Sequence, residues 1–222
     1  LDFLRRVDKV LFGLCIICAG FSMLLLYSIY ANGFMTSSRS VWIQLAATII
    51  GIAAAVVVSM VDYELMAKLW KFHLPFTVFL VLLTFVFGIQ REGADDKAWL
   101  DLGITTIQPS EFLKISFIVT FAYHLFKVKN HLNTPKTLGL LLLHMVAVSG
   151  LIVVQGDFGS ALIFLFIGIC MLIVAGLSWK VILGGVISLP VVGFLVWNFI
   201  FSDLHRRRVI IAFNPALDPS GD

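Results

Sequence analysis

Seven apolar stretches, each long enough to cross a lipid bilayer as a helix, most constrain how this chain can fold. A crossing helix needs roughly 20 mostly apolar residues, because the hydrocarbon core of a bilayer is about 30 Å thick. Backbone N–H and C=O groups cannot stay unpaired in lipid, so the predicted fold is an all-α, polytopic bundle of membrane helices. The spans that we expect are Val10–Tyr30, Val41–Val61, Leu74–Gln90, Pro109–Phe126, Leu138–Val154, Phe158–Leu177 and Val181–Phe201.

The composition agrees with a membrane protein and argues against several other classes. Of the 222 residues, 60% are hydrophobic and 13% are charged, whereas soluble domains carry about a quarter charged residues. The net charge is +3 and the basic residues are scattered, so nothing indicates a nucleic-acid partner. Cys15 and Cys18 have C-x-x-C spacing, but no second pair or histidine cluster completes a zinc site. The motifs of familiar soluble enzymes are absent from the sequence.

Lysine and arginine counts predict the orientation, because cytoplasmic connections are enriched in both. With the N-terminus in the cytoplasm, the inner segments carry Arg5, Arg6, Lys9, Lys68, Lys71, Lys127, Lys129, Lys136 and Lys180. The outer segments carry Arg39, Arg91, Lys97, Arg206, Arg207 and Arg208. This excess favours a cytoplasmic N-terminus, with the three consecutive arginines as the exception. Either residues 202–222 begin a large outer loop, to which the rule applies weakly, or a span is wrong and residues 155–159 form a re-entrant segment.

The run 108-QPSEFLK-114 places two ionisable residues near the start of a predicted span. Pro109 suits the first turn of a helix, so Glu111 could reach back to the N-cap as in a capping box. Lys114 does not fit that explanation, because a cation near a helix N-terminus opposes the helix dipole. Three residues apart, Glu111 and Lys114 can pair along one face. Ionisable groups within spans are costly and usually face a cavity or the bundle interior, so we favour a buried polar site.

Two outer loops carry further candidates. In 155-QGDFGS-160, Asp157 could cap the next helix or contact a ligand, and both interpretations stay open. In 91-REGADDKAWLDLG-103, Trp99 either rests at the membrane interface or belongs to a site. If both loops face outward, Glu111, Lys114 and Asp157 could line one cavity that opens to the outer face.

After the last span, 203-DLHRRRVIIAFNP-215 contains Arg206, Arg207 and Arg208. Consecutive arginines can anchor a helix at the lipid headgroups. They also suit phosphate binding, because the guanidinium fork matches phosphate oxygens. An anionic lipid headgroup is therefore the natural partner of these residues on the outer face.

These features resemble the SEDS family of bacterial cell-shape, elongation, division and sporulation proteins (RodA, FtsW and SpoVE). The resemblance rests on 93-GADDKAWLDLG-103, 107-IQPSEFLK-114, 155-QGDFGSAL-162, 175-AGLSW-179 and 206-RRRVIIAFNPALDPSG-221. The Q-P-S-E-x-x-K run after a W-L-x-L-G loop is the most specific signal. The G-L-S-W segment and the last stretch lean towards the RodA branch. Gly156 and Phe158 depart from the family pattern, which usually has proline and leucine there.

The resemblance implies a ten-span protein of the bacterial inner membrane, of which residues 1–222 would be the N-terminal part of a single membrane domain. It implies polymerisation of lipid II into glycan strands, together with a class B penicillin-binding protein that crosslinks them. Glu111 and Lys114 match the family's buried pair, Asp157 and Trp99 match outer-loop residues, and the arginines match the start of the large outer loop. The catalytic base is expected beyond residue 222, so the fragment alone should be inactive.

Three functional hypotheses follow. The first is a peptidoglycan glycosyltransferase in which Lys114 and the three arginines stabilise the departing pyrophosphate. A divalent cation could share that task, although the sequence shows no ligand set for it. The second is a lipid II flippase, because buried charges in a bundle also suit transport of an amphiphile. The third is a membrane scaffold that recruits the crosslinking enzyme.

Overall fold

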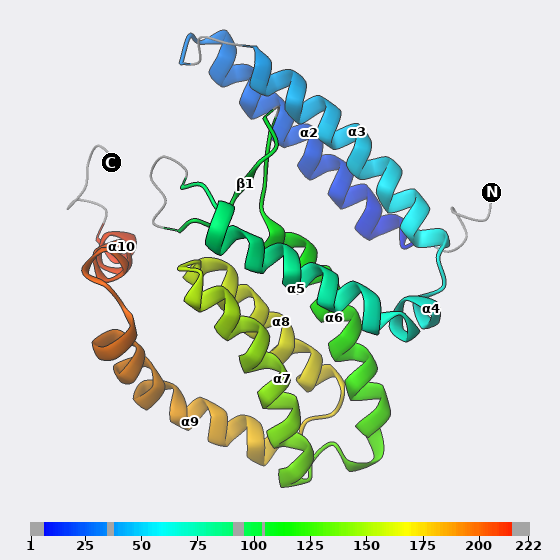
Figure 1. The fold of residues 1–222 in the computed structure, drawn as a ribbon, viewed down its shortest axis with the longest axis vertical. Helices are drawn as coiled ribbons and strands as arrows, with labels where there is room; N and C mark the ends of the chain where they lie inside the picture. The colour runs from blue at the N-terminus through cyan, green and yellow to red at the C-terminus, as the bar shows by residue number, and fades with distance from the viewer. Residues whose placement is uncertain (1–6, 35–37, 91–95, 104, 215–222) are drawn as a thin grey trace. The chain divides into compact units, whose positions relative to one another are not determined.

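The computed structural model describes residues 7–34, 38–90, 96–103 and 105–214, and helices dominate it (Figure 1). The α-helices are α2 (Lys9–Ala31), α3 (Arg39–Met60), α4 (Tyr63–Lys68), α5 (Trp70–Phe87), α6 (Pro109–Val128), α7 (Pro135–Val154), α8 (Phe158–Val174), α9 (Trp179–Leu195) and α10 (Asp203–Phe213). A 3₁₀ turn, η1 (Lys129–His131), follows α6, and a π-helical stretch, η2 (Val196–Ile200), follows α9. The short strands β1 (Leu100–Asp101) and β2 (Thr106–Ile107) pair with each other.

A helix lies at each of the seven predicted spans, so the predicted all-α membrane fold is confirmed. Five of them are long and apolar enough to cross a membrane: α2, α3, α5, α7 and α9 with η2. The other two are α6, which carries three charged residues, and α8, which is an apolar helix of 17 residues.

Several boundaries differ from the predicted ones. Helix α7 begins at Pro135 rather than Leu138, because proline is well suited to the first helical turn, where its missing N–H has no partner to lose. Helix α10 was not predicted, since residues 202–222 were expected to begin a loop. The signal was available in Ser202, whose hydroxyl caps α10 by accepting from the His205 N–H. The remainder of that stretch, residues 215–222, lies outside the described residues.

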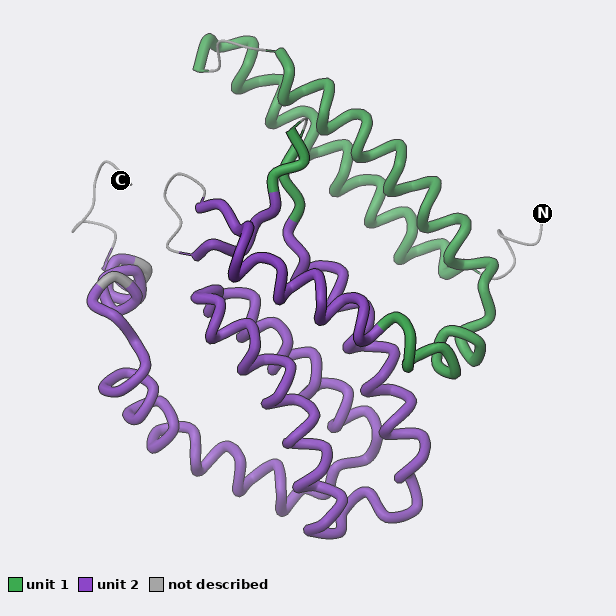
Figure 2. Tube along the Cα trace, in the orientation of Figure 1, with its two compact units in different colours: residues 1–73, 101–107 green, residues 74–100, 108–222 purple. Residues whose placement is uncertain are grey.

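The chain divides into two compact units (Figure 2). Unit 1 comprises residues 1–73 and 101–107, and its helices α2 and α3 pack against each other. Neither helix contains a buried residue, and both expose large apolar side chains such as Leu24 and Ile50. In lipid this exposure is expected, because acyl chains are as apolar as leucine.

Unit 2 comprises residues 74–100 and 108–222, and its core lies among α6, α7 and α8. Phe117 is fully buried and contacts Phe121 and Phe164 at ring-centroid distances of 5.2 and 5.5 Å. Helices α7 and α8 approach closely at Gly168, where a Cβ atom would collide with the Met145 side chain. Small residues at such crossings let helix backbones come together in membranes.

Two ends of unit 2 matter for function. The first, which we call the Asp157 end, contains the N-termini of α6 and α8, which are joined by a hydrogen bond from Gln108 to Asp157. The second, the Asn133 end, contains the α6–α7 and α8–α9 connections. There Asn133 accepts a hydrogen bond from the Ser178 N–H and donates one to the Gly176 carbonyl.

Replacing Gly88 with alanine should destabilise unit 2. A Cβ atom at Gly88 would overlap the carbonyl oxygens of Thr84 and Lys97, and backbone cannot yield as a side chain can. We expect a loss of about 1–3 kcal/mol, as for other overpacked sites, measured as a lower thermal unfolding temperature of the purified full-length protein. The control is Gly150→Ala in α7, where nothing lies within 4 Å of the added carbon. Equal unfolding temperatures for the two variants would contradict the close approach.

Candidate functional site

Asp157 occupies a tight turn between α7 and α8. Gly156 has a φ of 92°, a left-handed conformation that glycine adopts without strain. The Asp157 Oδ1 atom accepts a hydrogen bond from the Ser160 N–H at 2.9 Å, so the predicted cap of α8 is confirmed. Residues 155–157 thus connect α7 to α8, and the re-entrant segment stays an alternative prediction.

The second oxygen of Asp157 binds another helix. Gln108, the N-cap residue of α6, donates from its Nε2 atom to Asp157 Oδ2 at 2.7 Å. The Gln108 side chain therefore does not cap its own helix. One carboxylate holds the N-termini of α6 and α8 together, which places the QPSE and QGDFGS segments at one site.

Glu111 and Lys114 form the predicted pair within the first turns of α6. Lys114 Nζ lies 2.6 Å from Glu111 Oε1, and the exposed fractions of the two side chains are 17% and 56%. The carboxylate of Glu111 thus binds the lysine. Within the described part of the chain, no hydrogen bond from Gln108 N–H to Glu111 is seen, as a capping box would require. The lysine is mostly enclosed by the bundle, and its partner reaches towards the surface.

The interior near the Asp157 end is polar, which the sequence interpretation missed. The side chain of Gln155, the C-cap of α7, donates a hydrogen bond to the Thr84 hydroxyl of α5, and both side chains are buried. Within the described residues, three buried oxygen atoms have no hydrogen-bond partner: Ser110 Oγ, Ser149 Oγ and Gln155 Oε1. Unpaired buried oxygens are costly, so this region is suited to water or to the hydroxyl groups of a ligand. The available signal was a set of small polar residues inside apolar runs.

Trp99 belongs to a segment that folds onto the end of α5. Its carbonyl accepts a hydrogen bond from the Ile89 N–H at 2.8 Å, and the adjacent Ala98 is fully buried. The Trp99 side chain is half-buried, which agrees with either interpretation of this residue. The residues 91–95 of the same loop lie outside the described residues.

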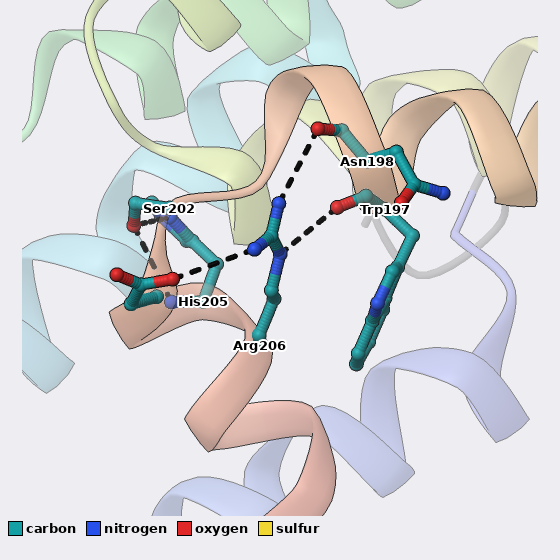
Figure 3. A network of polar contacts seen from close by, with 6 residues as sticks. Trp197, Asn198, Ser202, His205 and Arg206 are labelled. Atoms are coloured by element: carbon teal, nitrogen blue, oxygen red, sulfur yellow. Dashed lines mark hydrogen bonds and ion pairs between the residues drawn. The ribbon is translucent and has the colours of Figure 1, made fainter.

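The three arginines are not equivalent, and Figure 3 shows the contacts of Arg206. Arg206 donates from Nε to the Trp197 carbonyl at 3.0 Å and from Nη2 to the Asn198 carbonyl at 3.3 Å. Its Nη1 atom lies 3.4 Å from Asp203 Oδ1. Arg206 therefore connects η2 to α10, by satisfying carbonyl groups at a helix end. Arg207 and Arg208 are exposed on α10.

Aromatic contacts bring α10 to the Asp157 end. The Phe158 ring packs edge-on against the His205 ring at a centroid distance of 4.3 Å, and against the Phe201 ring at 5.7 Å. Phe158 directly follows Asp157, and His205 directly precedes the arginines. Asp157 and the start of α10 are therefore neighbours, although Asp157 and His205 are 48 positions apart in the sequence.

A bound metal ion would need ligands beyond those seen here. Among the described residues, no group of three or more His, Cys, Asp or Glu side chains is arranged to hold a metal ion. A divalent cation shared with the pyrophosphate of a ligand stays a prediction.

Comparisons with known proteins agree with the sequence motifs. The sequence model of the FtsW/RodA/SpoVE family, described as cell cycle proteins, matches residues 8–222. A probable peptidoglycan glycosyltransferase FtsW from Trichlorobacter lovleyi is 29% identical over 98% of this chain and 58% of its own length. The peptidoglycan glycosyltransferase MrdB of Escherichia coli is 29% identical over 77% of this chain and 46% of its own length. The chain thus spans about half the length of these curated relatives.

Two solved structures have a similar fold. A chain in a peptidoglycan synthase complex, studied for the coordination of polymerization and crosslinking, matches 96% of this chain with a TM-score of 0.75 and 26% identity. That match covers 61% of the solved chain. The rod shape determining protein RodA of Thermus thermophilus shares the fold over 78% of this chain and 58% of its own, with a TM-score of 0.55 and 24% identity. The family model covers nearly the whole chain, and the chain therefore belongs to the FtsW/RodA/SpoVE family.

Proposed function

We propose that this chain is the N-terminal part of a peptidoglycan glycosyltransferase that polymerises lipid II at the outer face of the bacterial inner membrane. The observation that carries the proposal is the Glu111–Lys114 pair, whose lysine is mostly enclosed, on a helix whose N-terminus is joined to Asp157. Enzymatic function is supported by the relatives, which are named peptidoglycan glycosyltransferases. We propose an orientation in the membrane with a cytoplasmic N-terminus. The Asp157 end then faces outward, and residues 202–222 begin the large outer loop.

The reaction explains why enclosed cations are needed. A sugar hydroxyl of one lipid II attacks the anomeric carbon of another, whose bond to the pyrophosphate oxygen breaks. The hydroxyl proton passes to a base, which we place beyond residue 222, and the undecaprenyl pyrophosphate leaves with additional negative charge. Cations positioned at the departing oxygens stabilise this charge, most strongly where water is excluded.

Lys114 is the residue that we assign to the departing pyrophosphate. Its side chain is mostly enclosed, and its ammonium group is held 2.6 Å from Glu111. The neighbouring carboxylate fixes the direction of this ammonium group. Glu111 is therefore a positioning residue in this proposal, and it transfers no proton.

The arginines divide the remaining work between support and binding. The guanidinium group of Arg206 contacts Trp197, Asn198 and Asp203. We therefore propose that Arg206 stabilises the position of α10. Arg207 and Arg208 are both exposed on the same helix, and we assign them to the anionic headgroup of lipid II. A guanidinium binds phosphate through parallel hydrogen bonds.

A crosslinking partner fits the same proposal. The similar solved chain comes from a synthase complex in which polymerization and crosslinking are coordinated. We therefore propose a class B penicillin-binding protein as the partner of the full-length protein, which would serve cell elongation or division.

The first test replaces Lys114 with alanine in the full-length protein, purified with its crosslinking partner and supplied with fluorescent lipid II. We expect a ladder of glycan chains from the parent protein and a loss of about 100-fold or more in rate for the variant, as for removal of an oxyanion donor. Glu111→Gln should lower the rate without changing lipid II specificity. The matched control is Lys68→Ala, which removes an exposed lysine from the Glu64–Lys68 pair.

The outcomes separate the competing functions. Equal activity of Glu111→Gln would contradict its positioning role. If the parent protein forms no ladder while a control polymerase does, the function is transport of lipid II or recruitment of the crosslinking enzyme. A flippase would then move labelled lipid II across vesicles, and a scaffold would not.

A second test separates the structural and chemical uses of Asp157. Asparagine caps a helix as well as aspartate does, and the Gln108 amide can turn so that its oxygen accepts from the asparagine Nδ2. Asp157→Asn should therefore keep most of the thermal stability but lose activity if the negative charge is used. Asp157→Ala should lose both, with about 1 kcal/mol of stability lost with the cap. Glycan synthesis and thermal unfolding are measured on the same preparations. Full activity of the asparagine variant would assign Asp157 to capping alone.

A third test compares two adjacent arginines. Arg206→Ala should lower the thermal stability, because two carbonyls and Asp203 lose their partner. Arg207→Ala should leave the unfolding temperature unchanged and raise the lipid II concentration needed for half-maximal rate. Steady-state kinetics and thermal unfolding of both variants measure these effects. A stability loss for Arg207→Ala together with a weaker lipid II affinity for Arg206→Ala would refute the assignment.

A further inference from the structure

The Asn133 end contains a cavity that the proposed polymerase reaction does not use. It has a volume of about 310 Å³ and is lined by the loop that follows α6 and by the two residues that follow α8, and its lining includes Lys129, His131 and Gly176. Its shape is fixed by Asn133, which is held by Gly176 at 3.2 Å and by Ser178 at 2.7 Å. Two loops that are 43 residues apart are thus tied into one wall.

The charge around this cavity is positive and unbalanced. Lys129 and His131 line it, and Lys127, Lys136 and Lys180 lie in the helix ends that flank the same two connections. Residues 112–156 and 158–202, which include both connections, contain no aspartate or glutamate. The neighbouring sequence therefore supplies no carboxylate to neutralise these lysines, and an anion from outside the chain can do so.

An apolar groove lies beside the cavity, along the bundle. It has a volume of about 360 Å³ between α6 and α8 and is lined by Ala122, Leu125, Cys170, Met171 and Val174. It shares Ala175 with the cationic cavity, so the two spaces adjoin. Small side chains such as Ala122 leave room for a chain of methylene groups.

The lysines lie at the level expected for lipid headgroups. The Lys127 ammonium sits 4.5 Å from the centre of the Tyr123 ring, and the Lys129 ammonium sits 4.9 Å from that of Phe126. Aromatic rings and basic side chains at the end of a span mark the membrane interface. The cavity would therefore open among headgroups and the groove among acyl chains.

We propose that the Asn133 end binds an anionic phospholipid, with the phosphate in the cationic cavity and one acyl chain in the groove. Basic pockets between helices on the cytoplasmic side are suited to anionic headgroups. A soluble phosphate would satisfy the cavity but leave the groove unfilled, so the joined spaces favour a lipid. In the orientation proposed above, this lipid comes from the cytoplasmic leaflet.

The lipid site is separate from the proposed reaction site. Lys114 and Lys129 lie near opposite ends of α6, and at 1.5 Å per residue they are roughly 20 Å apart along its axis. Binding can therefore be measured without any requirement for polymerase activity.

The test is native mass spectrometry of the full-length protein, titrated in mild detergent with phosphatidylglycerol or phosphatidylcholine. We expect tighter binding of phosphatidylglycerol. The double variant Lys129→Gln/His131→Gln should weaken it by at least about fivefold, the change expected for one lysine near an anionic surface. The control Lys68→Gln, a lysine outside this end, should leave it unchanged. Equal binding of both lipids, or an unchanged double variant, would overturn the proposal.

A groove variant distinguishes a lipid from a soluble phosphate. Ala122→Phe fills the groove with an aromatic ring and should weaken phosphatidylglycerol binding, while binding of glycerol 3-phosphate stays as in the parent protein. The side chains of Ala122, Lys129 and His131 are all exposed, so these variants should keep the fold, which thermal unfolding checks. If glycerol 3-phosphate competes for the cavity and Ala122→Phe has no effect on phosphatidylglycerol, the ligand is a soluble phosphate and the lipid proposal fails.

Discussion

The carboxylate of Asp157 is the contact on which the site in unit 2 depends. One oxygen caps α8 through Ser160, and the other accepts from Gln108 at the start of α6. A negative charge is favourable beside two helix N-termini, where unpaired N–H groups concentrate positive potential. The same bond fixes the start of α6, and thereby the position from which Lys114 enters the bundle. Removing it would loosen two helices and the ion pair together.

The sequence predicted what depends on local pattern. The positions of the seven spans follow from apolar length, the cap at Asp157 from residue type, and the Glu111–Lys114 pair from its spacing on a helix. Helix α10 was missed because its mean polarity resembles that of a loop, although Ser202 and Asp203 are typical of a helix start. Helix N-cap residues are a weak signal where no apolar periodicity follows them.

Contacts between distant segments could not be predicted in this way. Nothing in one sequence pairs Gln108 with Asp157, Thr84 with Gln155, or Phe158 with His205. These pairs arise from the crossing of helices, which depends on the shapes of buried residues, such as the Phe117 ring and the missing side chain of Gly168. The different contacts of the three arginines could not be predicted either, because adjacent residues in a sequence do not indicate which carbonyl groups lie near each side chain.

The anchoring of Arg206 has a geometric consequence for the residues that follow it. Successive side chains on an α-helix leave the axis about 100° apart. With Arg206 turned towards the carbonyls of η2, Arg207 and Arg208 are directed to two other sides of α10. Insertion of a single residue between Ser202 and Arg206 would rotate a different side chain into this place and redirect the remaining charge. The bonds of one arginine thus act as a fixed angular reference for the other two.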